Sequence, residues 1–130
     1  MACKYGSHRV LEPKGVLPQP ALRLDNDFST IAENEILVDV RALNIDSASF
    51  TQIEEEAGGD LAKIEAKILS IVAERGKMQN PVTGSGGMFI GTVAKVGAAL
   101  AGRDLAPGDR IASLVSLSLT PLKIDRIVKI

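Results

Sequence analysis

Cysteine is almost absent from this chain of 130 residues, in which Cys3 is the only one. A disulfide framework within the chain is therefore excluded, and so is a zinc site built from cysteines. Aromatic residues are also scarce, at three Phe, one Tyr and no Trp. Because nucleic acids and sugars are commonly bound by stacking on aromatic rings, these ligands are disfavoured.

The chain also has no excess of charge, with 15 basic and 16 acidic residues. No net field draws it to nucleic acid or to an anionic membrane, so neither is expected as a partner. No apolar run is long enough to span a bilayer, and the first residues contain no apolar signal segment. The length and a hydrophobic fraction of 45% predict one cytoplasmic domain with a buried core.

The first half of the chain predicts a strand followed by helices. Residues 35–43 alternate between apolar and polar side chains, which is typical of a half-buried strand. Ser49 and Gln52 have the spacing of a capping box, so a helix is expected to begin there. Asp60 is expected to cap a second helix, which carries one apolar stripe and ends at Gly76.

The second half of the chain is rich in glycine and predicts β-structure. We expect a strand over residues 88–96, a tight turn at 107–110 and another strand over 111–117. Residues 122–130 keep an apolar pattern. That pattern predicts either a last element docked on the core or a fragment of a longer protein. The fold class is therefore α+β, mainly β with helices.

The segment Gly84-Ser85-Gly86-Gly87 superficially resembles a phosphate-binding loop. A dinucleotide-binding loop needs G-x-G-x-x-G between a strand and a helix, but Phe89 replaces the third glycine and a strand follows. Two interpretations remain. The glycines either allow close backbone contact in a bent sheet, or they expose N–H groups to a substrate carboxylate.

A polar loop follows the first long strand, over residues 44–51. Polar side chains on a loop held by a rigid sheet are a frequent location of chemistry. Asp46 in this loop is a candidate for either catalysis or helix capping, whereas Ser49 fits capping better. The only histidine, His8, is expected to be structural or solvated.

Three segments together resemble the GroES-like domain of the medium-chain dehydrogenase/reductase superfamily. They are residues 35–44, residues 86–97 and the turn and strand at 107–112, and their order and spacing agree with that family. The resemblance implies a partly open β-barrel over residues 1–130, with a helical insertion around residues 50–76. It also implies that the nucleotide-binding Rossmann domain lies downstream, in a part of the polypeptide not included in this chain.

The sequence departs from zinc-dependent members of that superfamily at the positions of the metal ligands. Asp46 stands where those members have a ligand cysteine, and Gly86-Gly87-Met88 stands where they have Gly-His-Glu. Two ligands of the catalytic zinc are therefore replaced, and the four cysteines of the structural zinc lobe are missing. We predict no metal.

Within the superfamily, nearly the whole chain resembles the family of L-erythro-3,5-diaminohexanoate dehydrogenases. The similarity covers residues 4–10, 12–20, 44–51, 75–88 and 114–122. It implies the substrate-side domain of an enzyme that oxidatively deaminates this diamino acid to 5-amino-3-oxohexanoate and ammonia, with NAD or NADP, in lysine fermentation. The complete enzyme is expected to be a homo-oligomer and the isolated fragment to be inactive.

The resemblance suggests roles for particular residues. Asp46 is the candidate base that accepts a proton from the C3 ammonium, or alternatively an acidic partner of a substrate ammonium. Substrate-binding candidates, which offer hydroxyl or backbone N–H groups, are Ser47, Ser49, Thr51, Thr83, Ser85, Gly86 and Gly87. We expect no cofactor-binding residue in this chain. Two other functions stay open: a zinc-free quinone or enoyl reductase, and a non-enzymatic GroES-like binding module.

Overall fold

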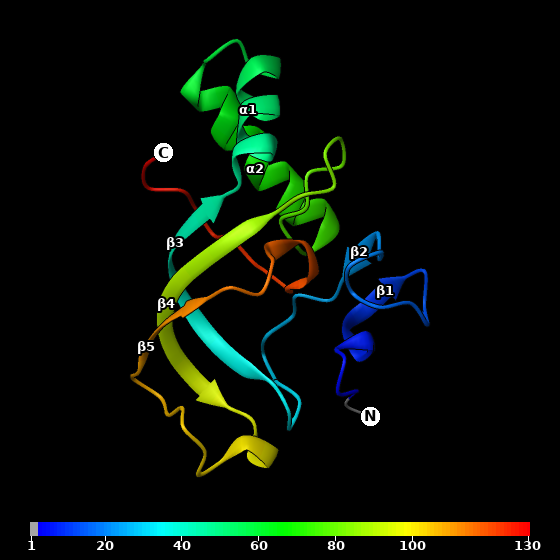
Figure 1. The fold of residues 1–130 in the computed structure, drawn as a ribbon, viewed down its shortest axis with the longest axis vertical. Coiled ribbons are helices and arrows are strands. Elements are labelled where there is room, and N and C mark those ends of the chain that lie inside the picture. Colours follow the sequence, from blue (N-terminus) through cyan, green and yellow to red (C-terminus); the bar gives the residue numbers. More distant parts are fainter. Residues whose placement is uncertain (1–2) are drawn as a thin grey trace.

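The computed structural model describes residues 3–130, which form two antiparallel sheets and two α-helices (Figure 1). The larger sheet has the order β3-β4-β5, with β3 at Ile36–Ile45, β4 at Gly87–Val96 and β5 at Arg110–Ser113. The pairing register of β3 and β4 shifts twice, and such bulges bend a sheet. The predicted α+β class is confirmed, and the partly open barrel stays a prediction.

The last strand is shorter than the predicted strand over 111–117. β5 pairs only with residues 89–92 of β4 and ends at Ser113. The chain then turns into a short 3-10 helix, η3 (Leu117–Leu119), because the Ser116 side chain accepts a hydrogen bond from the backbone N–H of Ser118. β5 therefore ends at Ser113, although β4 continues to Gly87, and the local cap at Ser116 begins η3.

Two helices follow β3, and both are capped by aspartate. α1 covers Ser47–Glu56 and begins ahead of the predicted start at Ser49, because the Asp46 side chain caps it. α2 covers Leu61–Arg75, and Asp60 accepts hydrogen bonds from the first turn as predicted. Gly76 ends α2 at a φ of 67°, a left-handed conformation that suits glycine.

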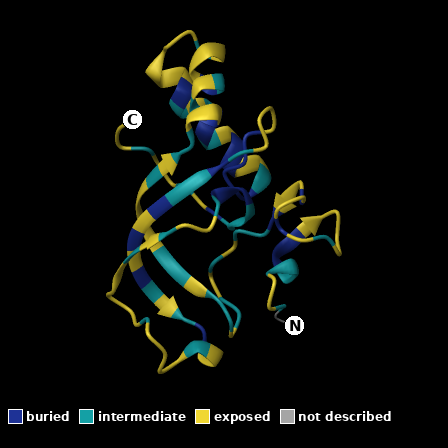
Figure 2. Ribbon diagram, in the orientation of Figure 1, coloured by how far each residue is buried: buried dark blue, intermediate teal, exposed yellow. Residues whose placement is uncertain are grey.

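The main core lies where the helices meet the end of the larger sheet (Figure 2). Apolar side chains of α1 and α2 pack there against β4, η3 and the following loop. The buried members are Ile53, Ile64, Ile68, Ile71, Val72, Met78, Phe89, Leu117 and Leu122. Burial of such side chains stabilises a fold by about 1.5–3 kcal/mol each, so this cluster holds the helical pair on the sheet.

A smaller N-terminal unit contains the 3-10 helix η1 (Ser7–Arg9), β1 (Val10–Glu12) and β2 (Arg23–Leu24). The apolar cluster of this unit is small. The remaining short helix, η2 (Ala98–Leu100), lies outside this unit and follows β4 in the chain. The side chain of Lys77 joins this unit to the end of α2. Its completely buried Nζ atom donates to the backbone oxygens of Pro18, at 2.8 Å, and Gln19, at 3.2 Å.

Burial lowers the pKa of Lys77 from 10.5 to about 8, and the nearby Arg75 guanidinium adds to this effect. The two carbonyl contacts nevertheless satisfy part of the hydrogen-bonding capacity of the buried amine.

Among the helices of residues 3–130, none has the length and apolar character that a membrane crossing requires.

Candidate functional site

A large cavity lies beside the polar loop that was predicted from the sequence. Its volume is about 1510 Å³, and its walls come from β3, from the start of α1 and from residues 120–130. Asp46, Ser47 and Thr51 line it. The structure therefore brings three of the predicted site residues to one opening, at the junction of a strand and a helix.

Asp46 lines this cavity and makes three hydrogen bonds to Gly86, Ser49 and Ser85. Its backbone N–H donates to the carbonyl of Gly86 at 2.9 Å. Its Oδ1 atom accepts the backbone N–H of Ser49 at 2.9 Å and the hydroxyl of Ser85 at 3.0 Å. Within residues 3–130, no hydrogen bond to Oδ2 is found. The helix cap and the Ser85 hydroxyl therefore share one carboxylate oxygen, and the other accepts no hydrogen bond from the described residues.

The glycine-rich loop brings two more predicted residues to Asp46, although they lie almost forty positions away in the sequence. The loop is closed by backbone hydrogen bonds between Asn80 and both Gly84 and Ser85. Ser85 Oγ lies 2.8 Å from Thr83 Oγ1. Ser85 is half-buried and Thr83 is exposed, so the row of hydroxyls runs from the surface to the carboxylate.

Ser49 differs from the other predicted serines because it is completely buried. It is the third residue of α1 and faces the core, where its Oγ finds no partner among the described residues. Its backbone oxygen accepts a hydrogen bond from the side chain of Asn80 at 3.3 Å. Ser49 therefore lies away from the cavity, and Ser47 and Thr51 are exposed beside it.

Gly86 and Gly87 are explained by close packing of the backbone. A Cβ atom on Gly86 would lie 2.6 Å from Ser118 N and 2.8 Å from Met78 O. Gly87 has a φ of 156°, and a Cβ there would collide with the backbone of Asn44. These contacts support the interpretation that the glycines serve a bent sheet. Their role in binding a carboxylate stays a prediction.

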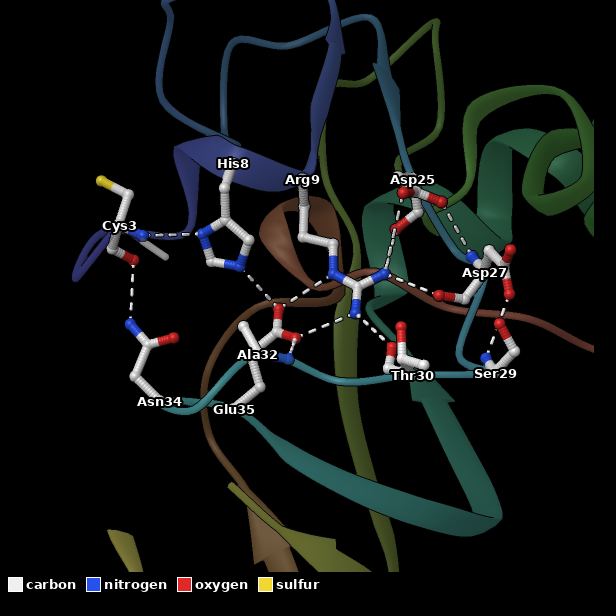
Figure 3. Close-up of polar contacts among 10 residues, drawn as sticks. All are labelled: Cys3, His8, Arg9, Asp25, Asp27, Ser29, Thr30, Ala32, Asn34 and Glu35. Carbon is white, nitrogen blue, oxygen red and sulfur yellow. Dashed lines mark hydrogen bonds and ion pairs between the residues drawn. The ribbon is translucent and has the colours of Figure 1, made fainter. Parts of the chain in front are cut away.

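A network of charged groups at the other end of the cavity was not foreseen from the sequence. It joins η1 to the start of β3 through Arg9 and Glu35, which both line the cavity (Figure 3). Arg9 donates from Nε and from one terminal nitrogen to the two oxygens of Glu35, at 2.9 Å each. No motif spacing predicts this pair, because its members are 26 positions apart.

Two further donors complete the surroundings of Glu35. The backbone N–H of Ala32 donates to it at 2.7 Å, and His8 Nε2 lies 2.9 Å from Oε2. His8 Nδ1 accepts the N–H of Cys3, so Nε2 carries the ring proton and donates it to Glu35. The Arg9 hydrogen bonds are the main reason that the pKa of Glu35 falls from 4.5 to about 2.

Side chains that could bind a metal ion do not cluster in the described residues. In the described part of the chain, no group of three or more His, Cys, Asp and Glu side chains could hold a metal ion. The absence of a metal from the enzyme stays a prediction, which rests on the replaced ligand positions.

Comparisons with known proteins agree with the resemblance seen in the sequence. Residues 8–130 match the model of the L-erythro-3,5-diaminohexanoate dehydrogenase N-terminal domain. Enzymes named L-erythro-3,5-diaminohexanoate dehydrogenase, from Acetoanaerobium sticklandii and Fusobacterium nucleatum, are each 71% identical over 129 residues. These matches cover 98% of the chain but 37% of each relative. The chain therefore belongs to the family of L-erythro-3,5-diaminohexanoate dehydrogenase N-terminal domains.

Proposed function

We propose that this chain is the substrate-side domain of a cytoplasmic NAD(P)-dependent amine dehydrogenase of lysine fermentation. Its substrate is L-erythro-3,5-diaminohexanoate and its products are 5-amino-3-oxohexanoate and ammonia. The observation that supports this most is Asp46, which lines the cavity and whose Oδ2 accepts no hydrogen bond within residues 3–130, in a chain 71% identical to enzymes of that name. A downstream Rossmann domain and a homo-oligomeric assembly belong to the same proposal.

Oxidation of the amine needs a base before hydride can leave. The C3 ammonium carries three N–H bonds and no lone pair, so one proton must first be removed. Asp46 Oδ2 accepts that proton, after which hydride leaves C3 and an iminium forms on the substrate. Water adds to the iminium carbon, and collapse of the resulting amino alcohol releases ammonia and the ketone.

The residues at the cavity suit a bound nicotinamide. When bound, NAD or NADP supplies the acceptor for the hydride. The cavity of about 1510 Å³ has room for a ring and a small substrate, and the exposed hydroxyls of Ser47 and Thr51 offer hydrogen bonds there. These two side chains orient the reactants, while the downstream domain holds most of the cofactor.

Replacement of Asp46 by Asn in the whole enzyme tests the base. Asn caps helices as well as Asp does, so α1 keeps its cap while the carboxylate is lost. We expect kcat to fall by roughly 10²- to 10⁴-fold, the usual contribution of a general base. The readout is NADH or NADPH formation together with ammonia release from 3,5-diaminohexanoate.

Asp60→Asn is the matched control, because Asp60 caps α2 in the same way and does not line the cavity. It should leave kcat unchanged. An unchanged kcat in Asp46→Asn would remove Asp46 from the role of base. A wild-type enzyme that reduces enones and leaves the diamino acid untouched would instead identify a zinc-free reductase.

A further inference from the structure

The hydrogen bonds around Asp46 have only one consistent direction. An ionised carboxylate accepts hydrogen bonds and cannot donate them, so Ser85 must give its only hydroxyl hydrogen to Oδ1. The Thr83 hydroxyl, 2.8 Å from Ser85 Oγ, must then be the donor in that contact. The three groups form a chain in which Thr83 orients Ser85 and Ser85 orients Asp46.

This chain and the helix cap act on the same atom. The Ser49 N–H and the Ser85 hydroxyl both donate to Oδ1, at 2.9 and 3.0 Å. They come from different parts of the fold, one from α1 and the other from the loop before β4. Two donors on one oxygen fix the plane of the carboxylate, and the lone pairs of Oδ2 are left as the free acceptor.

We propose that Ser85 is a positioning residue for Asp46, which Thr83 orients in turn, and that the base atom is Oδ2. This inference rests on the proposed function and deepens it. It also replaces the expectation that Ser85 and Thr83 hold the substrate carboxylate, because their hydroxyl hydrogens are already committed to other protein atoms.

The two possible roles of Ser85, positioning of Asp46 and binding of the substrate carboxylate, predict different kinetics for Ser85→Ala in the whole enzyme. Loss of a positioning contact lowers kcat roughly tenfold with KM nearly constant, because it acts on the reacting geometry.

Hydroxyl-retaining variants separate positioning from loss of fold. Ser85→Thr keeps the donor and should restore kcat. Thr83→Ser should behave as the wild type, and Thr83→Val, which keeps the shape and loses the hydroxyl, should lower kcat in the direction of Ser85→Ala with KM nearly constant. Ser29→Ala is the matched control, because it removes a hydroxyl from the carboxylate of Asp27, and neither Ser29 nor Asp27 lines the cavity.

Wild-type activity on 3,5-diaminohexanoate tests the proposed function, and the comparison of variants tests this inference. With an active wild type, a Ser85→Ala enzyme whose KM rises tenfold or more at constant kcat would show a substrate-binding serine and overturn the proposal. An unchanged kcat in both Ser85→Ala and Thr83→Val would overturn it as well.

Discussion

Replacement of Glu35 by Gln removes the negative charge that holds Arg9 in the interior. The Arg9 side chain is only 9% exposed and the Glu35 side chain 20%, and both oxygens of Glu35 are bonded to the guanidinium. Gln keeps the shape but loses the charge. A buried cation is then left without its counter-ion, which is more costly than the loss of an exposed pair.

The size of the effect follows from the pKa of Glu35, which lies at about 2 in the folded protein instead of 4.5. A difference of about 2.5 pH units corresponds to about 3 kcal/mol of stability. Because the pKa is lowered by folding, this contribution is fully present above pH 4.5. It is lost as the pH falls toward 2, where the unfolded chain binds the proton first.

Urea unfolding of the wild type and of Glu35→Gln, measured from pH 7 down to pH 2, checks this reasoning. We expect a difference of about 3 kcal/mol at pH 7 that shrinks between pH 4.5 and 2. Asp25→Asn is the control, because Asp25 is 43% exposed and lies 3.9 Å from Arg9. It should cost less than about 1 kcal/mol. A difference between wild type and Glu35→Gln that stays constant across this pH range would refute the argument.

Two further predictions concern packing. The pKa of Lys77 is about 8 in the fold and 10.5 when unfolded, so wild-type stability should rise between these values, by up to about 3 kcal/mol. Lys77→Met should abolish the rise in urea unfolding, and a rise retained by the variant would contradict the assignment. Gly86→Ala should lower the unfolding free energy by about 1–3 kcal/mol, because its Cβ would collide with Ser118 and Met78. An unchanged thermal midpoint in Gly86→Ala would show that the backbone at Met78 and Ser118 can move away from residue 86 at no cost.

Much of the local structure could be predicted from residues close together in the sequence. Alternation over residues 35–43 predicted β3, and the apolar stripe between Asp60 and Gly76 predicted α2. Both patterns repeat within a few residues, so local spacing carries the information. The start of α1 was harder to place, because Asp46 and Ser49 are both good capping residues and only the backbone conformation decides between them.

The sequence by itself determined the family, the α+β class and the candidate Asp46, since each depends on residue types in order along the chain. Only the tertiary structure decided which oxygen of Asp46 is free, that Ser49 is buried and that Ser85 donates to the carboxylate. The Arg9–Glu35 pair likewise became visible only in the fold. The physical reason is distance along the chain: these contacts join segments that the packing of β3, β4 and the helices brings together, and no local pattern encodes them.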